Sequence, residues 1–195
     1  MLDRVRRGGR ADEGPAAPAE PPAVRVRLIE HGDRDEFLAL VRESRDLHRP
    51  WAYPPDRNDQ FDELVARSRR DDVVTLLGCR AEDRALFGVF TISQIVRGSF
   101  QSAYLGYYGH ARYARQGYMR EAMKIVLDHA FGPMGLHRIE ANIQPGNTPS
   151  TALAMGAGFR LEGFSPRYLL IGGRWRDHER YAITVEEWRE RHPRK

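Results

Sequence analysis

The segment Tyr104–Ala130 reads YLGYYGHARYARQGYMREAMKIVLDHA and combines an extended run, a basic turn and an amphipathic helix. From Met119 onward the apolar residues recur at the spacing of one helical face, and charged residues fill the positions between them. The turn before this helix ends in Arg115-Gln116-Gly117, and its glycine permits backbone angles that other residues avoid. Because the first amides of a helix have no acceptor within the helix, this turn predicts an anion-binding site. An ordinary strand-to-helix connection on a basic protein is the alternative interpretation.

The composition of the chain is typical of a single globular domain, with 195 residues of which 41% are hydrophobic and 30% charged. Residues 1–23 offer almost nothing to bury and predict a disordered or loosely attached tail, followed by a folded domain over residues 24–195. No apolar run approaches the roughly 20 residues that span a bilayer, so we expect a cytoplasmic protein with no membrane partner. The single cysteine, Cys79, excludes an internal disulfide and a cysteine-rich metal site, so no metal is expected.

The formal net charge of +4 suits a phosphate-bearing cofactor, and it would also suit transient contact with RNA or a ribosome. The same charge argues against a polycationic substrate such as an aminoglycoside, and we expect no direct binding of DNA. Two nucleotide-binding motifs are missing from the sequence, namely the Walker A pattern and the GxGxxG pattern of dinucleotide-binding folds. Their absence argues against nucleotide hydrolysis and nicotinamide chemistry.

The order of the remaining segments outlines the fold class. The pair Gly172-Gly173 between two apolar runs predicts a hairpin near the end of the chain, and the segment 47–55 predicts a proline-rich loop. A strand–helix–strand unit over residues 103–143 requires one pair of parallel strands. The order β-α-α-β-β-β-α-β-α-β-β therefore predicts an α/β (α+β) fold with a mixed sheet. Strands are expected at 24–29, 73–80, 86–95, 103–110, 136–143, 168–171 and 181–183, and helices at 33–41, 59–69, 119–130, 148–155 and from 184.

Several side chains are candidates for chemistry. Asn147 is a natural N-cap for the helix that follows it, which is the simpler interpretation of this residue. Ser150 lies in the first turn of the same helix, where its hydroxyl either bonds the backbone or points into a cleft. The other candidates are two acids and four aromatic residues, each of which taken alone is more often structural than catalytic: Glu140, Glu162, Trp51, Tyr53, Tyr107 and Tyr108.

Four stretches of the chain share the pattern of one known superfamily: LGYYGHARYARQGYMREA (105–122), LHRIEANIQPGNTPS (136–150), GF (158–159) and YLLIGGRWRDHERYAIT (168–184). They resemble the GNAT superfamily of N-acetyltransferases, and more closely its RimJ/RimL type, which acetylates the N-terminal amine of ribosomal proteins. The resemblance runs from about Val24 to Thr184. The superfamily's phosphate-binding pattern Q/R-x-x-G-x-G/A reads Ala114-Arg115-Gln116-Gly117-Tyr118-Met119 here, so both ends of the pattern depart from it.

The resemblance implies a mixed, mostly antiparallel central sheet with helices on both faces, splayed between its fourth and fifth strands. It implies acetyl-CoA as co-substrate, with the pyrophosphate on the glycine turn and the pantetheine arm along a strand edge. Glu162 would be the general base and Ser150 the general acid, and the loop with Trp51 and Tyr53 would form the acceptor side. The residues implied to bind the cofactor are Tyr107, Tyr108, Gly109, Arg115, Gln116, Gly117, Tyr118, Met119, Arg120 and Asn147.

The implied activity is direct transfer of an acetyl group from acetyl-CoA to a primary amine, without a covalent enzyme intermediate. The resemblance favours the N-terminal α-amine of a protein, such as ribosomal protein S5, as the acceptor. Two alternatives stay open: an acetyltransferase for small-molecule amines or antibiotics, and a noncatalytic CoA-binding module associated with the ribosome. Proteins of this type occur as monomers or homodimers, and the sequence favours neither state.

Overall fold

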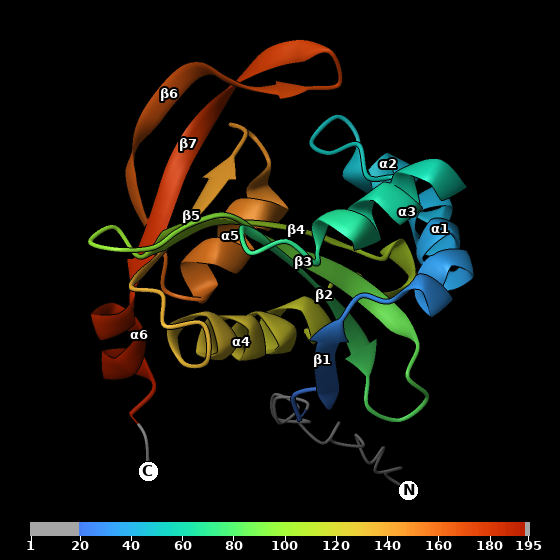
Figure 1. Ribbon diagram of the computed structural model, residues 1–195, viewed down its shortest axis with the longest axis horizontal. Helices are drawn as coiled ribbons and strands as arrows, with labels where there is room; N and C mark the ends of the chain where they lie inside the picture. Colours follow the sequence, from blue (N-terminus) through green and yellow to red (C-terminus); the bar gives the residue numbers. More distant parts are fainter. Residues whose placement is uncertain (1–19, 194–195) are drawn as a thin grey trace, which may run out of the picture.

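The computed structural model describes residues 20–193, so the predicted tail lies outside the described residues as far as residue 19. A seven-stranded sheet runs through the domain in the order β1-β2-β3-β4-β5-β7-β6 (Figure 1). None of the helices within residues 20–193 has both the length and the apolar character needed to cross a bilayer. The strands are β1 (Val24–Leu28), β2 (Val73–Arg80), β3 (Leu86–Val96), β4 (Ser102–Gly109), β5 (Arg138–Ile143), β6 (Arg160–Ile171) and β7 (Arg174–Thr184). The helices are α1 (Arg34–Glu43), α2 (Arg45–His48), α3 (Asn58–Arg67), α4 (Tyr118–Phe131), α5 (Thr148–Gly156) and α6 (Val185–Arg191), with short 3-10 turns η1 (His31–Asp33) and η2 (Ala111–Tyr113).

Neighbouring strands pair antiparallel everywhere except between β4 and β5, which are parallel and are connected through α4. The ladder between β4 and β5 is short: it begins at Ser102↔Arg138, ends at Tyr104↔Glu140 and contains three residue pairs. Beyond Tyr104 both strands continue without pairing to each other. The predicted sheet, mixed and mostly antiparallel with a splay between its fourth and fifth strands, is therefore confirmed.

Helices cover both faces of the sheet, as predicted (Figure 1). On the face that we call the α1–α3 face, Phe37 and Phe61 are fully buried and pack edge to face with their ring centroids 5.1 Å apart. On the opposite side, the α4 face, the apolar stripe of α4 is fully buried against the sheet together with parts of α5 and α6. The predicted helical face of α4 consists of Ala122, Met123, Val126, Leu127 and Ala130, each 0% exposed.

The bounds of two regions differ from the predictions. The segment predicted as a loop from Leu47 begins inside the short helix α2, because three prolines in the sequence mark only where a helix must end. Strands β6 and β7 are much longer than their apolar cores, with 12 and 11 residues. The polar sections outside these cores show no strand pattern in the sequence, and they are extended because each strand pairs with the other. The hairpin turn itself is confirmed, since Gly172 and Gly173 both have positive φ, +57° and +76°.

Truncating the stripe of α4 should cost far more stability than truncating the exposed side of the same helix. Leu127→Ala leaves a cavity at a fully buried position, so we expect a loss of about 2–5 kcal/mol in the free energy of unfolding. Ile125→Ala on the same helix, where the side chain is 38% exposed, should cost less than about 1 kcal/mol. Urea denaturation of both variants measures the difference, and equal losses would contradict the described orientation of α4.

Candidate active site

The free edge of β4 starts where the strand loses its partner β5. The amide of His110 donates to the carbonyl of Phe87 in β3, over 2.8 Å. Because successive residues of a strand present their backbone groups to opposite edges, Tyr107 and Gly109 present theirs toward the edge that β5 has left. The splay therefore exposes a strand edge that can pair with an extended, amide-bearing ligand.

The turn at the start of α4 lies next to this edge and exposes a row of amides. Arg115 and Gly117 both adopt left-handed backbone angles, with φ of +61° and +85°. Alternation of left-handed and ordinary residues lets successive amides point into one concavity, which is how such turns bind anions. Among the described residues no acceptor is found for the amides of residues 115–119, whereas the amide of Arg120 donates to the Gly117 carbonyl. The amides of residues 115–119 are therefore the ones open to an anion, and the predicted role of Arg120 would depend on its side chain.

Side chains of the predicted cofactor residues hold this turn in place. Tyr118 packs on Phe87 with ring centroids 5.1 Å apart, and a methyl group placed on Gly88 would overlap the side chain of Met119. Gln116 donates from its side-chain amide to the Arg112 carbonyl over 2.9 Å. These contacts leave the backbone amides of the turn as the groups available to a ligand.

Tyr108 and Gly109 contact helix α2 on the α1–α3 face. The Tyr108 ring is buried against His48, and the two ring centroids lie 5.2 Å apart. His48 Nε2 lies 2.8 Å from the Gly109 carbonyl oxygen, and because that oxygen can only accept, Nε2 carries the proton. Nδ1 of His48 is buried without a partner, and burial lowers the pKa of the imidazole, so His48 stays neutral. Its lone-pair nitrogen is enclosed, which suits a positioning role rather than proton transfer.

Across the splay, Ser150 and Tyr107 connect α5 to the free edge of β4. The Ser150 hydroxyl donates to the Tyr107 hydroxyl over 3.0 Å, and the Tyr107 hydroxyl donates to the Ser150 carbonyl over 2.8 Å. Burial raises the pKa of Tyr107 to about 12, so this phenol remains protonated near neutral pH. Asn147 caps α5 through its side-chain oxygen, which accepts from the Ser150 amide. The structure therefore brings Ser150, Asn147 and the edge of β4 together.

Trp51 and Tyr53 lie where the loop after α2 meets two other segments. The Trp51 carbonyl accepts from the Gln144 side chain over 2.8 Å, just after the end of β5. A methyl group placed on Gly172 would overlap the Tyr53 ring, so this ring lies directly on the tip of the β6–β7 hairpin. In Figure 1 the hairpin projects past the rest of the sheet, and its tip approaches this loop. Both residues thus border the α1–α3 side of the splay, where an acceptor would approach.

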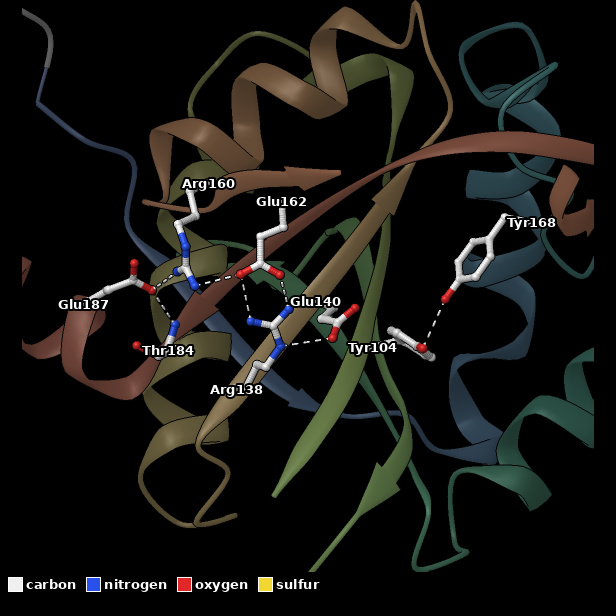
Figure 2. A network of polar contacts seen from close by, with 8 residues as sticks. All are labelled: Tyr104, Arg138, Glu140, Arg160, Glu162, Tyr168, Thr184 and Glu187. Carbon is white, nitrogen blue, oxygen red and sulfur yellow. Dashed lines mark hydrogen bonds and ion pairs between the residues drawn. The ribbon is translucent and has the colours of Figure 1, made fainter. Parts of the chain in front are cut away.

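Glu162 lies between Arg138 and Arg160 (Figure 2). Register shifts between Leu161 and Gly163 make Glu162 the extra residue of a β-bulge, which redirects its side chain. Its carboxylate accepts hydrogen bonds from Arg138, one of them 3.0 Å long, and from Arg160 over 2.7 Å. Figure 2 shows how this ion-pair network continues from Arg160 to Glu187 and from Arg138 to Glu140.

The position and charge of Glu162 argue against the predicted role of general base. Arg138 pairs with Ser102 at the closed end of the splay, whereas Ser150 contacts Tyr107, five residues and roughly 16 Å further along β4. The hydrogen bonds from Arg138 also hold the pKa of Glu162 below its usual value, which makes it a weaker base. The sequence indicated Glu162 as a candidate acid, but no sequence pattern indicated the β-bulge that places its side chain among arginines.

The structure adds a pair of tyrosines that the sequence analysis did not single out. Tyr104, the last residue of β4 paired with β5, shares a 3.1 Å hydrogen bond with the hydroxyl of Tyr168 from β6 (Figure 2). This hydrogen bond and burial raise the pKa of Tyr104 to about 12. Tyr104 is therefore protonated near neutral pH, at the point where the strands part. The alternation within β4 could have indicated Tyr104, since it shares a strand face with Tyr108.

A free strand edge beside an amide-lined turn fits a ligand with both a diphosphate and an amide-bearing arm, as coenzyme A has. A free strand edge and an amide-lined turn, together in a splayed mixed sheet, define the class of protein: an acyl-CoA-dependent transferase. Within residues 20–193, no group of three or more His, Cys, Asp or Glu side chains is placed to hold a metal ion.

Comparison with known proteins gives the family. A family model described as an acetyltransferase (GNAT) domain matches residues 24–160, and the chain belongs to this family of N-acetyltransferases. A probable N-acetyltransferase, YjcK of Bacillus subtilis, is 33% identical over 82% of this chain and 93% of its own length. The [ribosomal protein uS5]-alanine N-acetyltransferase of Escherichia coli is 30% identical over 84% of this chain and 88% of its own length.

Solved structures agree with this assignment. RimJ of Mycobacterium smegmatis, in complex with CoA-disulfide, superposes with a TM-score of 0.78 at 29% identity, covering 88% of this chain and 85% of that protein. A spermidine N-acetyltransferase of Vibrio cholerae, in complex with CoA and spermine, has a TM-score of 0.72 at 21% identity, covering 85% of this chain and 97% of its own. At the latter identity the likeness shows a shared fold.

Glu162→Gln distinguishes an ion-pair role of this residue from a catalytic one. The pKa of Glu162 is lower in the folded state than the ordinary 4.5, so the ion pair stabilises the fold above about pH 4.5 and is lost on acidification. We expect the variant to unfold with about 1 kcal/mol less free energy at pH 7, a deficit that shrinks as the pH falls below 4.5. The measurements are urea denaturation at several pH values and kcat for acetyl transfer.

The kcat of Glu162→Gln distinguishes an ion-pair role of this residue from that of a general base. An ion-pair role leaves kcat for acetyl transfer within about twofold of the wild type, whereas loss of a general base lowers it roughly 100-fold or more. A loss of that size, with the fold intact, would restore the base assignment.

Proposed function

We propose that this protein transfers the acetyl group of acetyl-CoA to the N-terminal α-amine of a protein, with ribosomal protein S5 as the first acceptor to test. The observation that supports it most is the splay itself, whose free edge and amide-lined turn fit coenzyme A. The uS5-alanine N-acetyltransferase at 30% identity supports a protein acceptor. Such a reaction would take place in the cytoplasm.

The residues of the splay divide the binding of the co-substrate between them. The amides of residues 115–119 would hold the diphosphate, and the backbone carbonyl of Tyr107 would pair with the pantetheine arm. The Gly109 carbonyl accepts from His48, so its second lone pair would be the one open to that pairing. Bound in this way, acetyl-CoA supplies an activated thioester. The Tyr107 amide is the donor best placed to stabilise negative charge on the thioester oxygen during attack.

Proton transfer then requires little from the protein. An α-amine has a pKa of about 7.7–8.0, against about 10.4 for lysine, so roughly a tenth of it is neutral and nucleophilic at pH 7. Its nitrogen forms the new bond to the acetyl carbon, the bond from that carbon to sulfur breaks, and the surplus proton leaves through water. We propose that Ser150 passes a proton to the departing sulfur and regains one from the water that took up the proton of the amine, since its hydroxyl lies at the splay against Tyr107. Tyr104 and Tyr168 would orient the incoming amine from the α1–α3 face.

Acetylation of a small-molecule amine is the second candidate. It is supported by the spermidine N-acetyltransferase of Vibrio cholerae, a relative with 23% identity to this chain.

An acceptor screen separates these functions. A peptide with the N-terminal sequence of ribosomal protein S5 should gain the mass of one acetyl group when incubated with enzyme and acetyl-CoA, and fragmentation should place it on the α-amine. The same peptide with a blocked N-terminus and an internal lysine is the control, because its lysine is almost fully charged at pH 7. Acetylation of spermidine in the same assay, with no reaction of the peptide, would establish the second candidate instead.

The backbone of the glycine turn should control cofactor affinity. A side chain at Gly117 would strain its φ of +85° and would lie 3.4 Å from Pro22, so Gly117→Ala should weaken CoA binding by about tenfold or more. Gly98→Ala is the matched control, since Gly98 also has a positive φ, +71°, but lies in the β3–β4 turn with open space around it. Calorimetric titration with CoA measures both variants. Equal affinities for Gly117→Ala and the wild type would exclude this turn as the diphosphate site.

A further inference from the structure

The three arginines of β7 have no ion-pair partner on the part of the chain that the structure describes, and two of them, Arg176 and Arg180, are half-buried. Neither Arg176 nor Arg180 has a carboxylate within 4.0 Å in residues 20–193, although many other arginines of these residues do. The Nε atoms of both arginines are buried without a hydrogen-bond partner, and so is the side-chain oxygen of Asn142. Each guanidinium is therefore only partly in contact with water, and a carboxylate that reached it would supply the partner that its buried Nε lacks.

Both arginines face the acceptor side of the splay. Tyr181 and Ile183 of β7 point into the core of the α4 face, so by strand alternation Arg176 and Arg180 point to the α1–α3 face. Arg180 pairs in register with Asn142 of β5, near the end of that strand. Its charge also acts on the Tyr104 hydroxyl at the splay. Arg176 lies four residues nearer the hairpin tip, about 13 Å along the strand, beyond the last paired residue of β5.

The carboxylates near these arginines are paired with other arginines or lie on the other face of β7. Glu140 accepts from Arg138, and Glu162, on which the charge of Arg180 also acts, accepts from Arg138 and Arg160. Asp177 and Glu179 alternate with the two arginines along β7 and therefore point to the opposite face. The α1–α3 face beside the splay thus presents Arg176 and Arg180 to an acceptor with no carboxylate of residues 20–193 paired to either of them. A polyamine would be repelled there, whereas an anionic acceptor would be attracted.

We propose that Arg176 and Arg180 select acceptors that carry a carboxylate close to the reactive amine, namely peptide N-termini with acidic residues within the first several positions. This inference rests on the proposed function and names the acceptor class for the same site. The amine would lie at the splay beside Tyr104, and the chain behind it would extend along β7 toward the hairpin tip. Carboxylates of that chain would give the two guanidinium groups the partners they lack, and Asn142 would accept from a peptide amide.

Three peptides test this assignment, with identical sequences except at positions 3 and 4, which are both Glu, both Gln or both Lys. The readout is kcat/KM from release of the CoA thiol. We expect the Glu peptide to be used about tenfold better than the Gln peptide, and the Lys peptide least well. Arg176→Gln should reduce the preference for Glu over Gln severalfold through KM, and Arg176→Glu should reverse the order of the Glu and Lys peptides.

Matched variants guard against indirect effects. Arg176→Lys keeps the charge and should keep most of the preference, and Arg189→Gln, an exposed arginine of α6, should leave it unchanged. Arg180→Gln tests the second arginine, with thermal unfolding as a check on its fold. Equal use of the three peptides, or preference for the Lys peptide by the wild type, would overturn the inference while leaving N-terminal acetylation intact.

A binding measurement separates the inference from the proposed function. If the enzyme binds CoA but acetylates none of the peptides, N-terminal acetylation is wrong. Calorimetric titration of the Glu peptide into the enzyme–CoA complex then decides the arginine site by itself. Binding that is weakened in Arg176→Gln supports the site, and absence of binding overturns it.

Discussion

The loss of pairing between β4 and β5 after Tyr104 is the constraint on which the site depends. Parallel strands that stayed paired would use their backbone groups on each other, and no edge would be open to a ligand. The separation is bridged by side chains, since the Tyr107 hydroxyl bonds to Ser150 at the start of α5. The same two residues therefore line the gap between the strands. At this point the candidate site and the architecture of the sheet share one set of contacts.

The two halves of the site are also joined on the acceptor side. Glu43 contacts His110 over 3.0 Å, the Ser44 hydroxyl accepts from the Ala111 amide, and His48 contacts Gly109. These residues lie at the end of α1 and in α2, while their partners lie in the connection from β4 to the turn at Gly117. A shift of α1 and α2 would therefore act directly on the backbone that leads to this turn. Because His48 is neutral and buried, this connection depends on shape and hydrogen bonding rather than on charge.

Much of this arrangement could be predicted from local sequence pattern. The buried face of α4, the turn at Gly117 and the hairpin at Gly172-Gly173 each follow from a short-range rule, and each matches the structure. The structure of the segments that these rules do not cover could not be predicted. Strands β6 and β7 owe their length to one another, and the bulge at Glu162 has no sequence pattern of its own. The role of Glu162, taken from resemblance, therefore conflicts with where the bulge places its side chain.

The irregularity of β6 has a second consequence. Between Ser165 and Leu169 three residues of β6 stand opposite Asp177 alone, and this excess brings Tyr168 to Tyr104. β6 is also the outermost strand of the sheet, with apolar side chains such as Leu161, Phe164 and Leu170 more than half exposed. A straight, apolar edge strand can pair with strands of other molecules. The two register shifts of β6 prevent a continuous hydrogen-bond ladder with such a strand. The irregularities that shape the candidate site therefore also help to prevent strand pairing between molecules.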